Sequence, residues 1–416
     1  MGFWRFPQSG VVARLAIGAL GSGVFLFAGQ APVSAHAMTP AASPNFQFDT
    51  APDAMLQSCQ LPTASIPCYG PAQIRTAYDV PSNADGTGTT IVIIDGFQSP
   101  TVQGDLAAFD ASWTLPAANL RVVAPDGATK PDPSQLGWFV EQAIDVEWAH
   151  AIAPGANLVL VQAKTGDDAD ILSATKYAID NNLGDIISMS FSEAESCPTA
   201  AFLADEHAAF ERAVANGMSL LAASGDNGAA ERSCAGALVS GVATPASDPL
   251  VTAVGGTTLV ADPSTGAYGS ETAWSHSGGG FSSVYRRPGY QAPFQKNNAA
   301  RGLPDVAWSA DRFGFGPSFV LGMKFKAAGT SVATAEWAGV AALAVQAAGH
   351  RLGAFNTSLY HAGKSNDAAS RFHDITTGNN SSPAFQGASA GPGWDPVTGL
   401  GTPDVANVLA WIAATS

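Results

Sequence analysis

Short runs of β-branched and apolar residues alternate with longer stretches of helical periodicity from residue 90 to residue 254, and this alternation constrains the fold most. Such runs have the length and composition of strands that are buried on both faces. Strands that alternate with helices are typical of a mostly parallel sheet with helices on both sides. The sequence therefore predicts an α/β fold with a doubly wound, mostly parallel sheet. The expected strands are Thr90–Ile94, Leu158–Gln162, Ile186–Ser190, Ser219–Ala223 and Leu250–Val254, and the expected helices are Val102–Phe109, Trp138–Ile152, Ala169–Ile179 and Phe202–Ala215.

The last third of the chain consists mainly of Gly-, Ser- and Pro-rich loops. Two helices are predicted within it. One begins at Ser331, because an Ala-rich stretch follows Gly329-Thr330-Ser331, and the other spans Asp404–Ala414. This region is expected to be loop-rich apart from those helices.

The first 37 residues have the pattern of a secretory signal peptide. Arg5 and Arg14 precede or begin an apolar stretch, and Ala35-His36-Ala37 supplies the small residues of a cleavage site. We therefore expect a signal peptide at 1–37, a linker or short pro-segment at 38–67 and one folded domain at 68–416. The expected location is extracellular or periplasmic, without membrane association after cleavage.

After removal of this segment the chain carries 34 acidic and 17 basic side chains, without a cluster of Lys or Arg. Such a chain is poorly suited to nucleic acid or to an anionic membrane, since it cannot neutralise many phosphates. It suits a protein that works in acid, where protonation of carboxylates lowers the net charge. We expect a monomer.

Four cysteines in an exported chain predict two disulfides, for which the sequence permits three pairings. The pairings that are local in sequence are Cys59 with Cys68 and Cys197 with Cys234. Buried thiols are the alternative, which is less favoured outside the cytosol.

Ser331 is the candidate nucleophile. It follows a glycine at the start of a predicted helix, where N–H groups and the helix dipole favour an oxyanion. A hydroxyl residue at this position is also a common helix cap, so its function depends on its partners. A Ser-His-Asp triad based on Asp95 is disfavoured, because none of the seven histidines has the context of a catalytic base.

Two carboxylates offer a different base. Glu141 and Asp145 are four residues apart on a predicted helix and therefore share a face, and no basic residue stands between Trp138 and Pro154 except His150. Neighbouring carboxyls tend to share a proton, which leaves one of them as a base. A solvated acidic face is the alternative. Asp226, on a Gly-rich turn, could be held neutral and donate a hydrogen bond to an oxyanion, or simply cap its own turn.

The C-terminal region has a second candidate site. Asp374-Ile375 and Gly391-Pro392-Gly393-Trp394-Asp395 place carboxylate and carbonyl oxygens on turns. Hard oxygen ligands on a loop suit calcium better than zinc, for which Cys and His ligands are mostly missing nearby. Ordinary Asx turns are the alternative.

With these residues the chain resembles the sedolisins, the serine-carboxyl peptidases with a subtilisin-like fold that include kumamolisin-like enzymes and tripeptidyl peptidases. The resemblance extends in family order over most of residues 69–416. The matching segments are EQAIDVEWAHAIAPGA from Glu141, ASGDNG from Ala223, ETAWSHSGGGFS from Glu271, RGLPDVA from Arg301, GTSVATAEWAG from Gly329, and the tail pieces FHDITTGNN and GPGWDPVTGLGTPD.

The resemblance implies a role for each candidate. Ser331 is the expected nucleophile, Glu141 the general base, Asp145 its proton-sharing partner and Asp226 the oxyanion donor. The Gly278–Gly280 loop is expected to line the substrate cleft. The tail is expected to hold one structural Ca²⁺, with the side chains of Asp374 and Asp395 and the backbone carbonyls of Ile375, Gly391 and Gly393.

The sequence departs from the family pattern in four places. The long N-terminal prodomain of the family is expected to be missing, because about thirty residues before Cys68 cannot form an independent domain. Ala335 stands where the family often has proline, which bears on helix geometry. Ser192 replaces a frequent glycine and Gln142 a frequent aromatic residue, and both changes are expected to affect substrate subsites.

The expected function is that of a secreted serine-carboxyl endopeptidase that acts on polypeptides in acid. Two alternatives remain at this stage. One is a catalytically silent relative that acts as a binding or envelope protein, and the other is a subtilisin-like variant built on Asp95.

Overall fold

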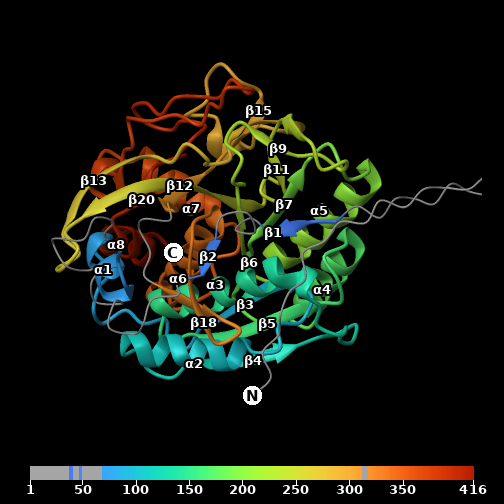
Figure 1. Ribbon diagram of the computed structural model, residues 1–416. Helices are drawn as coiled ribbons and strands as arrows, with labels where there is room; N and C mark the ends of the chain where they lie inside the picture. Colours follow the sequence, from blue (N-terminus) through green and yellow to red (C-terminus); the bar gives the residue numbers. More distant parts are fainter. Residues whose placement is uncertain (1–36, 41–45, 49–67, 312–316) are drawn as a thin grey trace, which may run out of the picture. The chain divides into compact units, whose positions relative to one another are not determined.

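An eight-stranded sheet lies at the centre of the described structure (Figure 1). The computed structural model describes residues 37–40, 46–48, 68–311 and 317–416, all within the compact unit Ala35–Ser416. The strand order is β13-β12-β8-β6-β3-β5-β4, and β16 also pairs with β12. All pairs are parallel except β12 with β13, so the predicted mostly parallel sheet is confirmed. The strands are β3 (Thr90–Gly96), β4 (Asn119–Val123), β5 (Asn157–Ala163), β6 (Ile186–Met189), β8 (Ser219–Ala223), β12 (Val251–Ala261), β13 (Tyr268–Ala273) and β16 (Val306–Ser309).

Helices cover both faces of this sheet, because its central strands are apolar on both sides. In β3, Ile91 and Ile93 belong to one buried cluster and Val92 and Ile94 to another. The first face packs against α3 and α6, and the second against α4 and α5. The helices are α1 (Pro71–Ala77), α2 (Val102–Trp113), α3 (Leu136–Ile152), α4 (Asp168–Asp180), α5 (Ala200–Ala215), α6 (Thr330–Ala348), α7 (Phe355–Lys364) and α8 (Val405–Thr415).

Helices α3 and α6 lie directly against each other, and Gly339 permits their close approach. A Cβ atom on Gly339 would lie 2.6 Å from the Cβ atom of Ile152 in α3. Because α3 also packs against α2 and β3, every residue of α3 from Trp138 to Ile152 is buried. The acidic side chains of α3 are therefore inside the protein, which contradicts the alternative of a solvated acidic face.

Two strands form within the segment that the sequence suggests is a linker. β1 (Thr39–Pro40) pairs antiparallel with β7 (Phe191–Ala194), and β2 (Phe46–Phe48) pairs antiparallel with β18 (Met323–Ala327). Figure 1 shows β1 next to β7, although about 150 residues separate them in sequence. The remaining strands form small sheets: β9 (Ala230–Arg232), β10 (Leu238–Ser240), β11 (Ala243–Thr244), β14 (Gly280–Arg286), β15 (Ala300–Leu303), β17 (Ser318–Val320), β19 (Phe372–His373) and β20 (Thr402–Pro403).

The structure tests one of the two cysteine pairings that are local in sequence, Cys197 with Cys234. Cys68 is disulfide-bonded, and its expected partner Cys59 lies outside the described residues. Cys197 and Cys234 are free thiols here and not a disulfide, although their side chains are within hydrogen-bonding contact. Burial, together with this contact, raises the pKa of the Cys197 thiol to about 12.

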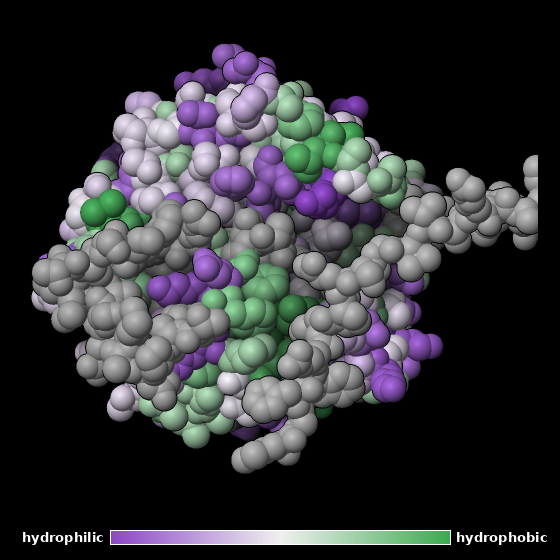
Figure 2. Space-filling model, viewed as in Figure 1, coloured by the Kyte–Doolittle hydropathy of each residue, from purple (hydrophilic) through white to green (hydrophobic). Residues whose placement is uncertain are grey.

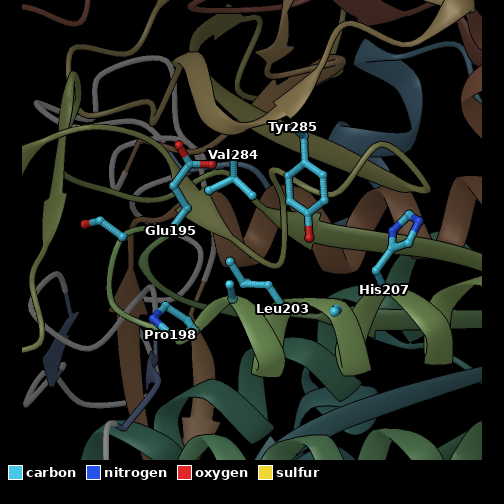
Figure 3. Close-up of a pocket in the computed structure, with 9 residues that line it drawn as sticks. Glu195, Pro198, Leu203, His207, Val284 and Tyr285 are labelled. Carbon is cyan, nitrogen blue, oxygen red and sulfur yellow. The ribbon is translucent and has the colours of Figure 1, made fainter.

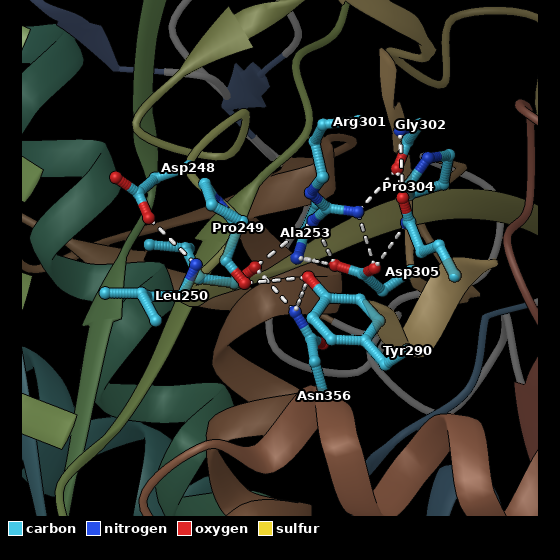
Figure 4. A network of polar contacts seen from close by, with 12 residues as sticks. Asp248, Pro249, Leu250, Ala253, Tyr290, Arg301, Gly302, Pro304, Asp305 and Asn356 are labelled. Carbon is cyan, nitrogen blue, oxygen red and sulfur yellow. Dashed lines mark hydrogen bonds and ion pairs between the residues drawn. The ribbon is translucent and has the colours of Figure 1, made fainter. Parts of the chain in front are cut away.

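A buried ion pair connects the sheet to the C-terminal helices (Figure 4). Arg301 binds both carboxylate oxygens of Asp305, and both side chains are fully buried. Asp305 also accepts hydrogen bonds from the backbone N–H of Ala253 at 2.8 Å and from the Tyr360 hydroxyl at 2.8 Å. The RGLPDVA segment therefore serves the scaffold, because its two charged residues hold β12, β15 and α7 together.

The expected signal peptide lies outside the described residues except for Ala37. Within the described part of the chain, no helix is both long and apolar enough to cross a membrane.

Candidate active site

The carboxyl ends of three neighbouring strands converge on the start of α6. Asp95 lies near the end of β3, Ser190 directly follows β6, and Asp226 follows β8. Since β3, β6 and β8 are adjacent and parallel, these ends lie at one edge of the sheet, where α/β proteins bind their ligands. The first turn of α6 lies against this edge, as the bond from Thr330 to Asp226 shows.

Ser331 is the second residue of α6 and is fully buried in the structure. Its Oγ lies 3.5 Å from the carbonyl oxygen of Ser190, which is the long limit of a hydrogen bond. Its backbone N–H lies in the first helical turn, where N–H groups have no acceptor within the helix. The position thus combines a hydroxyl with N–H groups that can stabilise a negative oxygen.

Glu141 and Asp145 lie in α3 one turn apart, and both are fully buried. The Ser190 hydroxyl donates a 2.8 Å hydrogen bond to Asp145 Oδ1, so Ser190 contacts both Asp145 and Ser331. Burial raises the pKa of Asp145 to about 8. Asp145 is therefore mostly protonated in neutral and acidic solution, which makes one member of the pair a proton donor.

Asp95 is a third carboxyl in this cluster. Burial raises its pKa well above the ordinary value, and the neighbouring charges of Asp145 and then Glu141 raise it further. Neither of its carboxylate oxygens has a hydrogen-bond partner among the described residues. Three buried carboxyls this close cannot all be ionised, so the cluster holds protons and one of its members can act as a base.

Asp226 is fixed beside Ser331 through Thr330. Its Oδ1 accepts hydrogen bonds from the backbone N–H and the hydroxyl of Thr330, both at 2.8 Å. Thr330 Oγ1 in turn accepts from the backbone N–H of Gly225 at 3.2 Å. Because Oδ1 is an acceptor in both contacts, a proton on this carboxyl belongs on Oδ2.

The glycine loop packs closely against the turn that carries Asp226. The N–H of Gly278 donates to the carbonyl of Gly225 at 2.7 Å, and a Cβ atom on Gly278 would lie 1.9 Å from the carbonyl oxygen of Ser224. Only glycine fits at this distance. This loop therefore lies next to the turn that carries Asp226, and its expected place in the wall of a substrate cleft stays a prediction.

The structure brings together all four candidate catalytic residues and adds three others. Ser190 and Thr330 make the contacts that connect them, and Asp95 joins the carboxyl cluster. From the sequence, Asp95 is expected only as the acid of an alternative triad. Its position at the end of a buried strand was the available signal. Thr330 lies in the matching segment that begins at Gly329, whereas Ser190 lies in none of the matching segments.

The described histidines offer no base at this site. His150 lies in α3 with its Nε2 3.4 Å from Asp110 Oδ1. His207 has the shorter contact with an acid, since its Nδ1 lies 2.6 Å from Asp248 Oδ2. It lines a separate cavity of about 410 Å³, together with Glu195, Leu203, Val284 and Tyr285 (Figure 3). None of the four candidate catalytic residues lines this cavity.

The tail residues expected to bind calcium are also brought together. The backbone N–H of Gly393 donates to both oxygens of Asp374, at 3.1 and 2.9 Å. Asp395 Oδ2 accepts from the N–H of Gly391 at 3.1 Å, and Ile375 is buried beneath the loop region. No described residue donates a backbone hydrogen bond to the carbonyl oxygens of Ile375, Gly391 or Gly393.

Comparison with known proteins identifies the family. The sequence profile of the subtilase family matches residues 139–359. Kumamolisin from Bacillus sp. (strain MN-32) is 33% identical over 384 residues, which cover 88% of this chain and 67% of kumamolisin. Among solved structures, Pseudomonas sedolisin, a serine-carboxyl proteinase complexed with two molecules of pseudo-iodotyrostatin, matches with a TM-score of 0.76 and 28% identity, over 85% of this chain and 100% of that chain. The chain belongs to the sedolisin family.

Membership of the sedolisin family makes the chain a serine-type peptidase with a subtilisin-like fold. A second relative, sedolisin from Pseudomonas sp. (strain 101), is 30% identical over 83% of this chain and 61% of its own length. The chain thus spans about two thirds of the length of these two relatives.

The structure shows the contacts of two residues that depart from the sedolisin pattern, Gln142 and Ser192. Gln142 is fully buried, donates to the carbonyl of Gly96 at 2.8 Å and accepts from Gln162 at 2.9 Å. It therefore fixes α3 to the ends of β3 and β5, and its expected effect on a substrate subsite stays a prediction. Ser192 lies in β7, where its hydroxyl donates to Glu231 at 3.3 Å.

Proposed function

We propose that this protein is a secreted endopeptidase that cuts polypeptides in acid and uses carboxyl groups, without histidine, to activate Ser331. The observation that carries the proposal is the contact of Ser190 with both Asp145 and Ser331, which joins a buried carboxyl pair to the hydroxyl at the start of α6. Family membership supports the same assignment of roles.

The proposed reaction is acyl transfer to water. Glu141 takes the proton of Ser331 Oγ, and Oγ attacks the carbonyl carbon of the peptide bond. The protonated Asp226 carboxyl and the backbone N–H of Ser331 donate hydrogen bonds to the resulting oxyanion. Glu141 then passes its proton to the leaving amine and activates the water that releases the acyl group.

Activity is expected to fall as the pH rises from 4 towards 8. Asp226 must be protonated to donate, and Asp145, whose pKa is about 8, adds a second buried negative charge when it ionises. The folded pKa of Asp145 is raised, so its contribution to stability is present below the unfolded pKa of about 4 and is lost as the pH rises through the folded value, at up to about 1.4 kcal/mol per pH unit.

The measurement is the rate at which the full chain digests an unfolded protein between pH 3 and pH 8. Circular dichroism at each pH separates loss of catalysis from loss of the fold. A rate that peaks at neutral pH would contradict the proposed role of Asp226. If the protein is folded but digests no substrate at any pH, the alternative is favoured that this chain is a catalytically silent relative of the peptidases.

We also propose that the tail binds one structural Ca²⁺. Two carboxylates and three backbone carbonyls give the hard oxygen donors that calcium prefers, and these carbonyls receive no backbone hydrogen bond from described residues. The side chains of Asp374 and Asp395 and the carbonyls of Ile375, Gly391 and Gly393 would hold the ion. Bound calcium would connect the Gly391–Asp395 loop to the segment after β19.

Calcium is expected to raise the melting temperature of chelator-treated wild-type protein by several degrees, because a ligand that binds only the folded state stabilises it. Asp395→Ala should abolish the increase. Asp367→Ala is the control, since its side chain is 73% exposed and lies outside the loop. Equal increases in wild type and Asp395→Ala would exclude this site.

A further inference from the structure

Glu336 is a buried acid that takes no part in the proposed acyl transfer. It lies in α6, five residues after Ser331, and it is the one ionisable side chain of that helix. The residue is fully buried, and neither of its carboxyl oxygens has a hydrogen-bond partner among the described residues. An ionised carboxylate is costly in such a place, because burial removes its hydration and nothing replaces it. Glu336 therefore has to carry a proton in the folded protein.

The elements that pack against α6 supply no counter-ion for Glu336. Helix α8 and the strands β6, β8, β12 and β16 contain no ionisable residue. The one ionisable residue of β3 is Asp95, which is itself an acid. Helix α3 contributes three acids and His150, and that histidine contacts the carbonyl of Pro116 and the carboxylate of Asp110. A negative charge on Glu336 would therefore stay unpaired.

Tyr78, which follows α1, and Glu271 in β13 are the other titratable groups on this side of α6. Burial raises the pKa of the Tyr78 hydroxyl, and the charges of Glu271 and then of Glu336 raise it further. The hydroxyl donates to Glu271 at 2.6 Å, so this proton is already used. Neither group can offset a negative charge on Glu336. Burial raises the pKa of Glu336 itself well above the ordinary value.

The surroundings of α6 are apolar. Val332, Ala335 and Trp337 of this helix belong to the large buried cluster between α3 and the sheet. On the face shown in Figure 2, apolar side chains also gather in the region where Figure 1 labels α3, the helix that packs directly against α6. An ionised Glu336 can therefore reach water only if α6 moves away from α3 and the sheet.

We propose that Glu336 is a pH switch that restricts the active arrangement of α6 to acid solution. When its carboxyl loses the proton to water, the negative charge drives α6 out of the core. Ser331, in the same helix, then leaves the carboxyl cluster of α3. The inference goes beyond the proposed function, because the switch acts on the fold, and only its effect on turnover rests on that function.

The direction of the pH effect follows from the pKa of Glu336. An unfolded glutamate has a pKa of about 4.3, and the folded one is higher. The stability that the protonated carboxyl contributes is therefore fully present below the unfolded value. It decreases as the pH rises and is lost once the pH has passed the folded value. Between the two values, the unfolding equilibrium constant rises up to about tenfold per pH unit from this group alone.

Urea denaturation of the full chain between pH 5 and pH 9 tests the switch. Glu336→Leu replaces the carboxyl with an apolar side chain of similar size. The logarithm of the unfolding constant should rise with pH more steeply in the wild type than in this variant, by up to about one per pH unit, because the two differ by one proton. The other buried carboxyls are present in both proteins and cancel. Glu336→Gln, which keeps the shape but cannot ionise, should show the same lower slope.

Glu211→Leu is the matched control, since the Glu211 side chain is 65% exposed in α5. An exposed carboxyl has a similar pKa in the folded and unfolded states, so this change should leave the wild-type slope unaltered. Equal slopes in the wild type and in both Glu336 variants would overturn the switch.

Amide hydrogen exchange tests whether the opening is in α6. Between pH 6 and pH 8, the amides of α6 should lose about tenfold or more of their protection in the wild type, after correction for the intrinsic exchange rate. Glu336→Leu should retain that protection. An equal loss in both proteins would overturn the movement of α6. Neither measurement uses catalysis, so these failures are distinguishable from an absence of peptidase activity.

Discussion

Ser331→Ala is expected to reduce the rate of polypeptide hydrolysis in acid by about 10⁴-fold or more, because it removes the only atom that can form the acyl enzyme. The fold should be retained, since Ser331 Oγ makes a single long contact with the Ser190 carbonyl. The measurement is the rate of digestion of an unfolded protein at pH 4, with near-ultraviolet circular dichroism to verify the native state.

Ser219→Ala is the matched control. Ser219 is also a fully buried serine, but it lies at the amino end of β8. Ser331 lies near the carboxyl ends of the strands, at the opposite end of the sheet. Its removal should leave the rate within about twofold, as expected for a small change distant from the site. If Ser331→Ala digests protein as fast as Ser219→Ala, the serine mechanism is wrong and the carboxyl cluster must act by another route.

The sequence allowed prediction of the parts of the fold that depend on local patterns. The run Thr90–Ile94 is apolar from Ile91 onwards because β3 is covered on both faces, and the structure extends the strand only to Gly96. The edge strand β4 was not predicted, since its half-buried residues show no continuous apolar run. Helix α7 was missed because it has only ten residues, although Phe355, Leu359 and Tyr360 have helical spacing.

The candidate site was predictable where its residues share a motif and not where they meet only in space. Glu141 and Asp145 are one helical turn apart, so their proximity follows from periodicity alone. Asp95 reaches the same cluster through the register of β3 beside β6, which no local pattern reveals. The pairing of β1 with β7 is equally non-local, because a two-residue strand has no periodicity of its own.

The burial of α3 excludes one of the two interpretations that the sequence permits for the acidic pair Glu141 and Asp145. An acidic pair on a helix is usually solvated, and only the packing of α6 on α3 shows that these carboxyls are buried. Gly339 is the residue that permits this packing, since a Cβ atom there would contact Ile152. The chemistry of the site thus depends on a glycine that makes no contact with Ser331.

Asp305→Ala is expected to lower the free energy of unfolding by about 3–5 kcal/mol, because it leaves the Arg301 guanidinium buried without its counter-ion. The same change removes the acceptor of the Ala253 N–H and of the Tyr360 hydroxyl. The measurement is urea denaturation at pH 5.

Asp180→Ala is the control, because it breaks the Arg212–Asp180 pair, whose side chains are 46% and 57% exposed. That change should cost less than about 1 kcal/mol, since solvent screens exposed pairs. Similar losses in both variants would show that the buried network is not what holds β12, β15 and α7 together.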